Sequence, residues 1–271
     1  MLRTTVPLAH ACARAGMWLM FSVTAAAQAG PSPTIAPPPP AEGDDADPTR
    51  SVAWSLREEY YSLPGQAWNN AFLVRVDRAF MKNRPRLAGR RGALTRFDIP
   101  VVVAGRPDGT TGGFGDIYWQ ALLVPYLTER FAFAAGSGIS LPTATGPRLG
   151  TGKLTIAPTA APVWFMPQRG LFFVKVQDYL SVAGDTDRPD LHYLTITPLL
   201  VWRVKGAPYW MQLDAETQTD WTRDARTGYK AGFLLGRMTK QRSGTWIKAE
   251  VGVGPYRVAN FAIKTSFFTV R

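Results

Sequence analysis

The sequence predicts an all-β fold, an antiparallel transmembrane β-barrel of about 12 strands, with about 10 strands as the alternative count. Short segments of alternating apolar and polar residues follow one another through the C-terminal part of the chain. The connections between these segments alternate between short and long. An apolar segment typical of protein export stands near the N-terminus.

The chain begins with a segment typical of a secretory signal peptide. Arg3 and Arg14 precede the apolar run 16–27, and small residues stand at its end. We therefore predict a cleaved signal peptide over residues 1–29. The run is too short for a spanning helix, which needs about 20 apolar residues. Because the single cysteine, Cys12, precedes the run, the exported chain would hold neither a disulfide nor a thiolate metal site.

Residues 30–50 are rich in proline and aspartate, so we predict a disordered linker that buries no core. Residues 51–271 would form one barrel domain, since no apolar run there is long enough for a transmembrane helix. Alternation and turn residues predict strands at 52–61 (a weaker segment), 72–77, 96–104, 114–125, 131–141, 153–165, 171–181, 191–204, 209–218, 228–238, 245–253 and 259–270.

Two strands show the alternation most clearly. In 191–204, Leu194, Ile196, Pro198, Leu200 and Trp202 share one face, while Thr195, Thr197 and Arg203 share the other. In 209–218, Tyr209, Met211 and Leu213 oppose Gln212, Asp214 and Glu216. A soluble sandwich also alternates in this way, so the targeting segment and the turn lengths have to distinguish the two folds.

Connection lengths predict the two ends of the barrel. Residues 126–130, 167–170 and 205–208 form short turns, and residues 142–152, 182–190 and 219–227 form long loops. We expect the short turns to be periplasmic and the long loops to be external. Aromatic residues beside the short turns predict an interfacial girdle: Tyr126, Trp164, Trp202, Tyr209 and Trp210. The basic segment from Lys82 to Arg91 is predicted to be a solvated loop.

The polar inner face supplies the candidate residues of a substrate path. They are Arg75, Asp77, Arg96, Asp98, Asp116, Gln120, Lys175, Gln177, Asp214, Glu216, Lys248 and Glu250. Both signs of charge occur, so these side chains either line a channel or pair across an interior that leaves no wide passage. The small residues Ala132, Ala134, Gly136, Gly138 and Ser140 leave room either for a ligand or for a side chain from elsewhere.

Several ordered motifs resemble one family. They are the run 113–125 (GFGDIYWQALLVP), 140–146 (SLPTATG), 149–153 (LGTGK), 181–190 (SVAGDTDRPD), 219–221 (TDW) and 96–100 (RFDIP). From about residue 62 onward the chain resembles the outer-membrane proteins labelled "MetA-pathway of phenol degradation", often described as transporters. The resemblance implies an outer-membrane barrel that passes small hydrophobic or aromatic compounds. The chain departs from the usual aromatic C-terminal residue of such barrels, because it ends on Arg271.

Catalytic and cofactor motifs are weak. His192 is the one histidine after residue 29, so a catalytic triad would have to use it, and no G-x-S-x-G elbow accompanies it. Asp185, Asp187 and Asp190 lack the calcium-loop pattern, so we expect an external loop paired internally through Arg188. We therefore predict no enzyme activity, no metal and no cofactor. The net charge of +11 does not predict nucleic-acid binding in an exported chain.

The sequence thus predicts a passive channel or transporter for small molecules, hydrophobic or aromatic ones among them, in the outer membrane of a Gram-negative bacterium. The alternatives are a non-conducting structural barrel, a lipid-modifying barrel enzyme that uses His192, and a soluble periplasmic β-sheet binding protein. The expected partners are outer-membrane lipids, the barrel assembly machinery and a small-molecule substrate, without nucleic acid.

Overall fold

The structure is a computed structural model that describes residues 52–82, 90–166, 169–239 and 242–270. The predicted signal peptide at 1–29, the linker at 30–50 and residues 83–89 of the predicted basic loop lie outside these ranges. Within the described residues, no helix has the length and apolar character that a membrane span requires.

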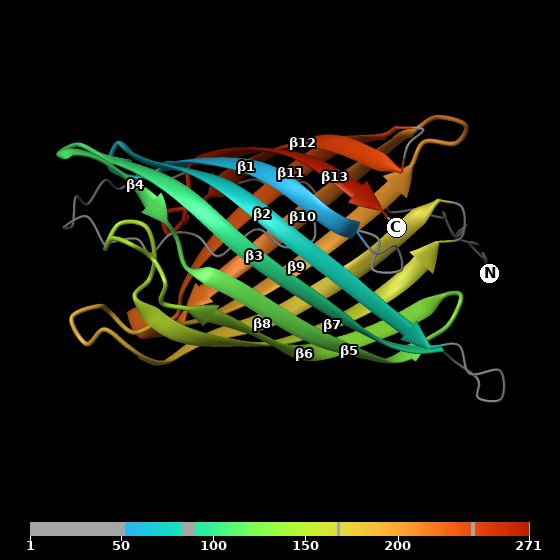
Figure 1. The fold of residues 1–271 in the computed structure, drawn as a ribbon, viewed down its shortest axis with the longest axis horizontal. Coiled ribbons are helices and arrows are strands. Elements are labelled where there is room, and N and C mark those ends of the chain that lie inside the picture. Colours follow the sequence, from blue (N-terminus) through green and yellow to red (C-terminus); the bar gives the residue numbers. More distant parts are fainter. Residues whose placement is uncertain (1–51, 83–89, 167–168, 240–241, 271) are drawn as a thin grey trace, which may run out of the picture. The chain divides into compact units, whose positions relative to one another are not determined.

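Strands make up nearly all of the described chain (Figure 1). In chain order they are β1 (Val52–Leu63), β2 (Ala67–Lys82), β3 (Arg90–Arg106), β4 (Gly109–Phe114), β5 (Ile117–Leu127), β6 (Phe131–Leu141), β7 (Lys153–Met166), β8 (Gly170–Gly184), β9 (His192–Arg203), β10 (Tyr209–Asp220), β11 (Arg226–Met238), β12 (Ser243–Val253) and β13 (Phe261–Val270), with a 3-10 turn, η1 (Trp221–Arg223), between β10 and β11.

The sheet closes on itself, because β1 pairs with both β2 and β13, and β2 also pairs with β3. All of these pairings are antiparallel. β4 and β5 both pair with β3 and act as one interrupted strand, so the fold is a closed barrel of 12 strands. The predicted fold class and strand number are confirmed.

The strands β2 and β3 are longer than the sequence predicted. Their ladder runs from Trp68 opposite Gly105 to Lys82 opposite Arg91. The prediction of a basic loop from Lys82 to Arg91 is therefore wrong for its first and last residues, since Lys82 and Arg91 pair with each other at the ends of β2 and β3. Backbone pairing continues wherever the neighbouring strand supplies N–H and C=O partners, even where the side chains do not alternate.

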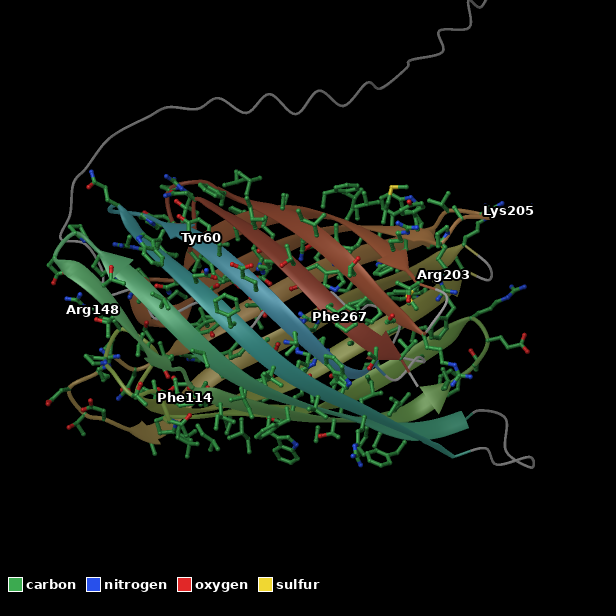
Figure 2. All side chains as sticks on the ribbon, turned by 45° about the horizontal axis from the view of Figure 1, so that its top comes forward. Tyr60, Phe114, Arg148, Arg203, Lys205 and Phe267 are labelled. Atoms are coloured by element: carbon green, nitrogen blue, oxygen red, sulfur yellow. The ribbon has the colours of Figure 1, made fainter. Side chains whose placement is uncertain are left out.

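The two faces of the strands differ sharply. On β12 the side chains of Trp246, Lys248 and Glu250 are buried, while those of the alternate residues Ile247 and Val251 are exposed. The same alternation leaves large apolar side chains exposed on the outer surface, among them Leu56, Phe72, Leu123, Leu213 and Ile263. Phe114 and Phe267, which are labelled in Figure 2, are exposed as well, and Tyr60 is partly exposed. The barrel is therefore apolar outside and mixed inside.

The connections gather at two opposite ends. One end, here the turn end, carries residues 128–130 and 204–208 and the last residues of β13. The other, the loop end, carries 142–152, 185–191, 221–225 and 254–260. Figure 2 shows Arg203 and Lys205 at the first and Arg148 at the second. The predicted short turns and long loops thus segregate as expected, although the short turn 64–66 also lies at the loop end. Two of the loops are shorter than expected because β8, β10 and β11 extend.

Candidate functional site

The turn-end half of the interior is filled with apolar side chains. This apolar cluster comprises Val124, Leu127, Ala132, Ala134, Ala161, Val163, Leu171, Leu199 and Val201, with Leu94, Leu122, Phe165, Phe173 and Trp210 packed against it. A second group, Leu234, Trp246 and Phe268, continues it through a contact with Trp210. The rings of Trp210 and Phe268 meet edge to face at 5.7 Å between centroids.

This cluster contains two corrections to the sequence analysis. Leu199 and Val201 share the inward face of β9 with Thr195 and Thr197, so that face is only half polar. Trp210 packs against the interior clusters and is no part of an outer girdle. The reason is the period of two, since Tyr209 is exposed and its neighbour must point the opposite way.

Candidate residues on β2 and β3 form two ion pairs in register. Arg75 lies opposite Asp98, and its guanidinium donates to both carboxylate oxygens at 2.6 and 2.8 Å. Both side chains are essentially inaccessible to solvent. Arg96 lies opposite Asp77 and donates to its Oδ1 at 2.9 Å. Each charge therefore has an adjacent partner on the barrel wall.

Candidate residues on β10 and β12 join an ionic network that also includes Lys230 and Lys264. The contacts run from Lys248 Nζ to Asp214 Oδ2 at 2.9 Å and to Glu250 Oε1 at 2.8 Å, from Lys264 Nζ to Glu250 Oε2 at 2.9 Å, and from Lys230 Nζ to Glu216 Oε1 at 3.2 Å. Three ammonium groups face three carboxylates, so the network is balanced in charge.

A glycine allows this network to cross a strand. Lys248 on β12 reaches Asp214 on β10 over β11, where Gly232 lies opposite both Asp214 and Glu250. A Cβ at this position would come within 2.8 Å of an Asp214 carboxylate oxygen and 2.9 Å of Lys248 Cε. Glycine is therefore the residue that leaves room for the ion pair.

Gln120, Gln177 and Lys175 lie nearer the middle of β5 and β8. Tyr118 Oη accepts hydrogen bonds from Gln177 Nε2 at 2.9 Å and from Gln120 Nε2 at 3.1 Å. Lys175 is half-buried on the same face of β8 as Gln177. The buried ring of Tyr118 occupies the space over Gly138, whose added Cβ would lie 2.1 Å from Tyr118 Oη. A side chain from elsewhere therefore fills the small-residue face of β6 at this point.

The loop-end half of the interior contains a cavity of about 100 Å³. Its wall includes the carboxylates of Glu59, Asp98 and Asp116. Four tyrosines also line it: Tyr61, Tyr118, Tyr179 and Tyr193. The interior is thus divided into a polar, aromatic cavity at the loop end and an apolar cluster at the turn end.

The long loop 142–152 folds over this cavity. Leu149 is buried against Val102 and Ala104 of β3, and it also lines the cavity. Asp116 accepts hydrogen bonds from Thr151 N at 2.6 Å, Thr151 Oγ1 at 2.8 Å and Ala144 N at 3.1 Å. Asp116 therefore holds the loop in place.

The acidic loop 185–191 is tied to its neighbours. Arg188 donates to the carbonyl oxygens of Pro147 and Gly150, so the predicted internal pairing of Arg188 with aspartates is wrong. Asp190 accepts from Lys153 Nζ at 2.8 Å, and this hydrogen bond lowers the pKa of the Asp190 carboxyl below its ordinary value. No group of three or more metal-ligating side chains occurs among the described residues.

His192 lies at the start of β9 beside Asp178, with 3.4 Å between His192 Nε2 and Asp178 Oδ2. Both side chains are about 40% exposed (42% and 40%). Since Tyr193 lines the cavity, the neighbouring His192 points to the outer face. His192 is therefore separate from the interior groups described above.

Sequence reasoning missed several interior charges, among them Arg57, Glu59, Lys153, Lys230 and Lys264. They occupy inward positions of β1, β7, β11 and β13 by the same alternation that identified the others, so the pattern could have found them. It could not have found the cavity, which depends on how side chains from strands on opposite sides of the barrel meet.

No protein-family model and no curated protein matches the chain in sequence. Solved structures do match in fold. An outer membrane channel from Pseudomonas putida F1 has a TM-score of 0.61 at 14% identity, over 81% of this chain and 96% of that one. The NanC porin has a TM-score of 0.52 at 10% identity, over 80% and 99%. The KdgM porin has a TM-score of 0.51 at 8% identity, over 79% and 98%. The chain therefore shares the fold of outer-membrane channels and porins.

Proposed function

We propose that the protein is an outer-membrane β-barrel that admits small, largely apolar molecules through its interior by passive passage. The exposed apolar side chains of the outer surface, such as Leu56, Leu123 and Leu213, suit contact with lipid rather than water. The fold shared with outer-membrane channels and porins points the same way. The proposed orientation puts the loop end outside the cell.

The single observation that carries the proposal is the division of the interior. A solute entering from the loop end meets the cavity first and the apolar cluster afterwards. An apolar constriction disfavours hydrated ions, because water readily leaves the constriction. An apolar molecule gains free energy when it leaves water for such a region, so this interior favours small hydrophobic or aromatic solutes, as the resemblance to the phenol-pathway family implies.

The apolar cluster also favours a second candidate, a non-conducting structural barrel. Leu199 and Val201 are buried against Ala161 and Val163, as in a packed core. If these contacts persist in the membrane, no solute passes. The candidate residues from Arg75 to Glu250 then serve only to balance charge inside the wall.

The decisive experiment measures flux through purified protein in proteoliposomes. We expect faster uptake of phenol than through protein-free liposomes, together with low ion conductance in planar bilayers. The narrowing variant Ala161→Phe should slow phenol uptake, because Ala161 lies in the apolar cluster. Leu213→Ala, on the exposed face of β10, is the matched control and should leave uptake unchanged. Equal uptake in protein-free liposomes would leave the structural barrel as the function.

Localisation and processing need their own measurement. We propose outer-membrane lipids and the barrel assembly machinery as partners and removal of residues 1–29 on export. Cell fractionation, N-terminal sequencing and electrophoresis of boiled and unboiled samples test this. A folded barrel in the outer membrane migrates differently before heating, whereas a soluble, heat-insensitive protein would contradict both the location and the transport proposal. No catalytic role is assigned to His192.

A further inference from the structure

The loop-end cavity has an acidic wall. Among the described residues that line it there are three carboxylates and no lysine, arginine or histidine. Two of the carboxylates are already engaged, since Arg75 binds Asp98 and the 142–152 loop binds Asp116. Glu59 is engaged less completely. Its Oε2 accepts from Tyr61 Oη, and its Oε1 forms an ion pair with Arg57 at 4.0 Å but has no hydrogen-bond partner among the described residues.

Three buried polar atoms of the cavity lining have no hydrogen-bond partner among the described residues. They are Glu59 Oε1, Asn69 Nδ2 and Thr155 Oγ1. Each of these residues is at most 3% exposed. Glu59 and Asn69 come from β1 and β2, and Thr155 comes from β7 on the opposite side of the barrel. Other interior atoms of the described residues lack partners too, but these three line one cavity, where a single occupant would supply the missing hydrogen bonds.

The aromatic side chains suit a positive occupant. Tyr179 and Tyr193 stack at 4.6 Å between ring centroids, and both line the cavity with Tyr61 and Tyr118. The Lys264 ammonium already lies 5.1 Å from the Tyr61 ring centroid. Aromatic rings attract ammonium groups through their negative faces. An ammonium beside Glu59 would therefore meet both a carboxylate oxygen and aromatic rings.

We propose that this cavity binds a small organic ammonium ion that has an apolar body and one hydrogen-bond acceptor. The ammonium donates to Glu59 Oε1, and the acceptor takes a hydrogen bond from Asn69 Nδ2. The apolar body packs against Leu73, Val102 and Leu149 of the lining. The inference goes beyond the proposed function, since an ammonium ion bound in the cavity need not cross the apolar cluster, and it rests on that function only because a solute must be able to reach the interior.

Binding to the purified barrel in a nonionic detergent tests the proposal. Methoxypropylammonium carries the ammonium and an ether acceptor, and methyl butyl ether has the same skeleton with a methyl group in place of the ammonium. Saturation-transfer NMR and calorimetry should detect binding of methoxypropylammonium. The barrel should bind methyl butyl ether and methoxybutanoate at least about tenfold more weakly. Equal signals from all three probes, or none, would overturn the proposal.

Variants locate the site. Glu59→Gln keeps the shape of the side chain but removes its charge, so it should weaken methoxypropylammonium binding by about tenfold. Glu58→Gln is the control, since Glu58 is exposed on the same strand. Ala71→Leu fills the cavity from β2 without changing any charge, and it should also weaken binding. Each variant is first checked for the heat-dependent shift of a folded barrel, and Ala71→Leu decides the matter if Glu59→Gln does not fold.

The two proposals fail separately. Binding of methoxypropylammonium without phenol flux would remove the transport function and keep the site. Flux without selective binding would remove only the site. Unchanged affinity in both Glu59→Gln and Ala71→Leu would also overturn the site, since binding would then occur elsewhere.

Discussion

Strands β7 and β9 change from polar to aliphatic inward side chains about halfway along the barrel. Towards the loop end they carry Thr155, Thr159, Thr195 and Thr197, and towards the turn end Ala161, Val163, Leu199 and Val201. The alternation of the sequence is the same in both halves, since all eight residues point inward. Period-two patterning therefore tells which face a residue occupies, but not whether the interior at that height is wet.

The largest expected effect concerns a buried ion pair of the polar part. Arg75→Leu leaves the inaccessible Asp98 carboxylate without its bidentate partner, so we expect a loss of about 3–5 kcal/mol in the free energy of unfolding. Urea titration followed by the heat-dependent gel shift measures this loss. The double variant Arg75→Leu/Asp98→Leu should recover most of it, and a double variant as unstable as the single one would assign the effect to packing.

The apolar cluster should respond to volume instead of charge. Leu199 is fully buried, so Leu199→Ala should lower the free energy of unfolding by about 2–5 kcal/mol through lost packing. Leu199→Met keeps the volume and should change it by less than about 1.5 kcal/mol. The same urea titration applies. If both variants unfold like the unsubstituted protein, the turn-end half is loosely filled and the comparison between the halves fails.

A smaller effect is expected from one hydroxyl between the two halves. Tyr118→Phe removes the acceptor of the Gln177 and Gln120 amides, so we expect a loss of about 1–3 kcal/mol for a buried donor left unpaired. The control Tyr126→Phe lies on the exposed face of β5 and should change the free energy of unfolding by at most about 0.5 kcal/mol. Equal losses in both would show that Tyr118 Oη is solvated.

The smallest effect is a pH dependence at the loop end. The Lys153 hydrogen bond lowers the pKa of Asp190 below 3.8, so the bond stabilises the folded loop above that pH and is lost as the pH falls through the lowered pKa. The hydrogen-exchange protection factors of residues 185–191, which correct for the slower intrinsic exchange at low pH, should therefore fall on acidification. Asp190→Asn should show fast exchange already at neutral pH, unlike Asp187→Asn in the same loop, and a slow Asp190→Asn loop would contradict the role of this contact.

Strand positions and the barrel were predictable because alternation and turn residues act locally. Thr195 and Asp214, for example, are buried as their periodicity predicted. The apolar cluster was missed because Leu199 and Val201 continue a face that begins with threonines, and nothing local marks where the interior changes. Trp210 was misplaced because its position beside a turn was weighed above its alternation with Tyr209.

The candidate site was predictable only as a set of inward residues. Adjacent-strand pairs such as Arg75 and Asp98 follow once the register is known. The contact from Lys248 to Asp214 crosses an intervening strand and depends on Gly232, which the sequence shows only as a glycine in a strand. Glu59 was missed because residues 52–61 were predicted only as a weaker strand and supplied no candidate residues, although its inward position follows the same alternation.

The pairing of β1 with β13 has a consequence for the order of folding. The backbone N–H of Asn260, just before β13, donates to the carbonyl oxygen of Ser62 in β1. Its side-chain amide donates to the carbonyl oxygen of Leu63, which is 197 positions away in the sequence. The seam between β1 and β13 therefore joins distant parts of the chain. Until β13 is in place, β1 and β12 each present an open edge to other chains. The seam carries the largest loop-closure entropy of any strand pair, and we expect it to form last and to limit the rate of assembly.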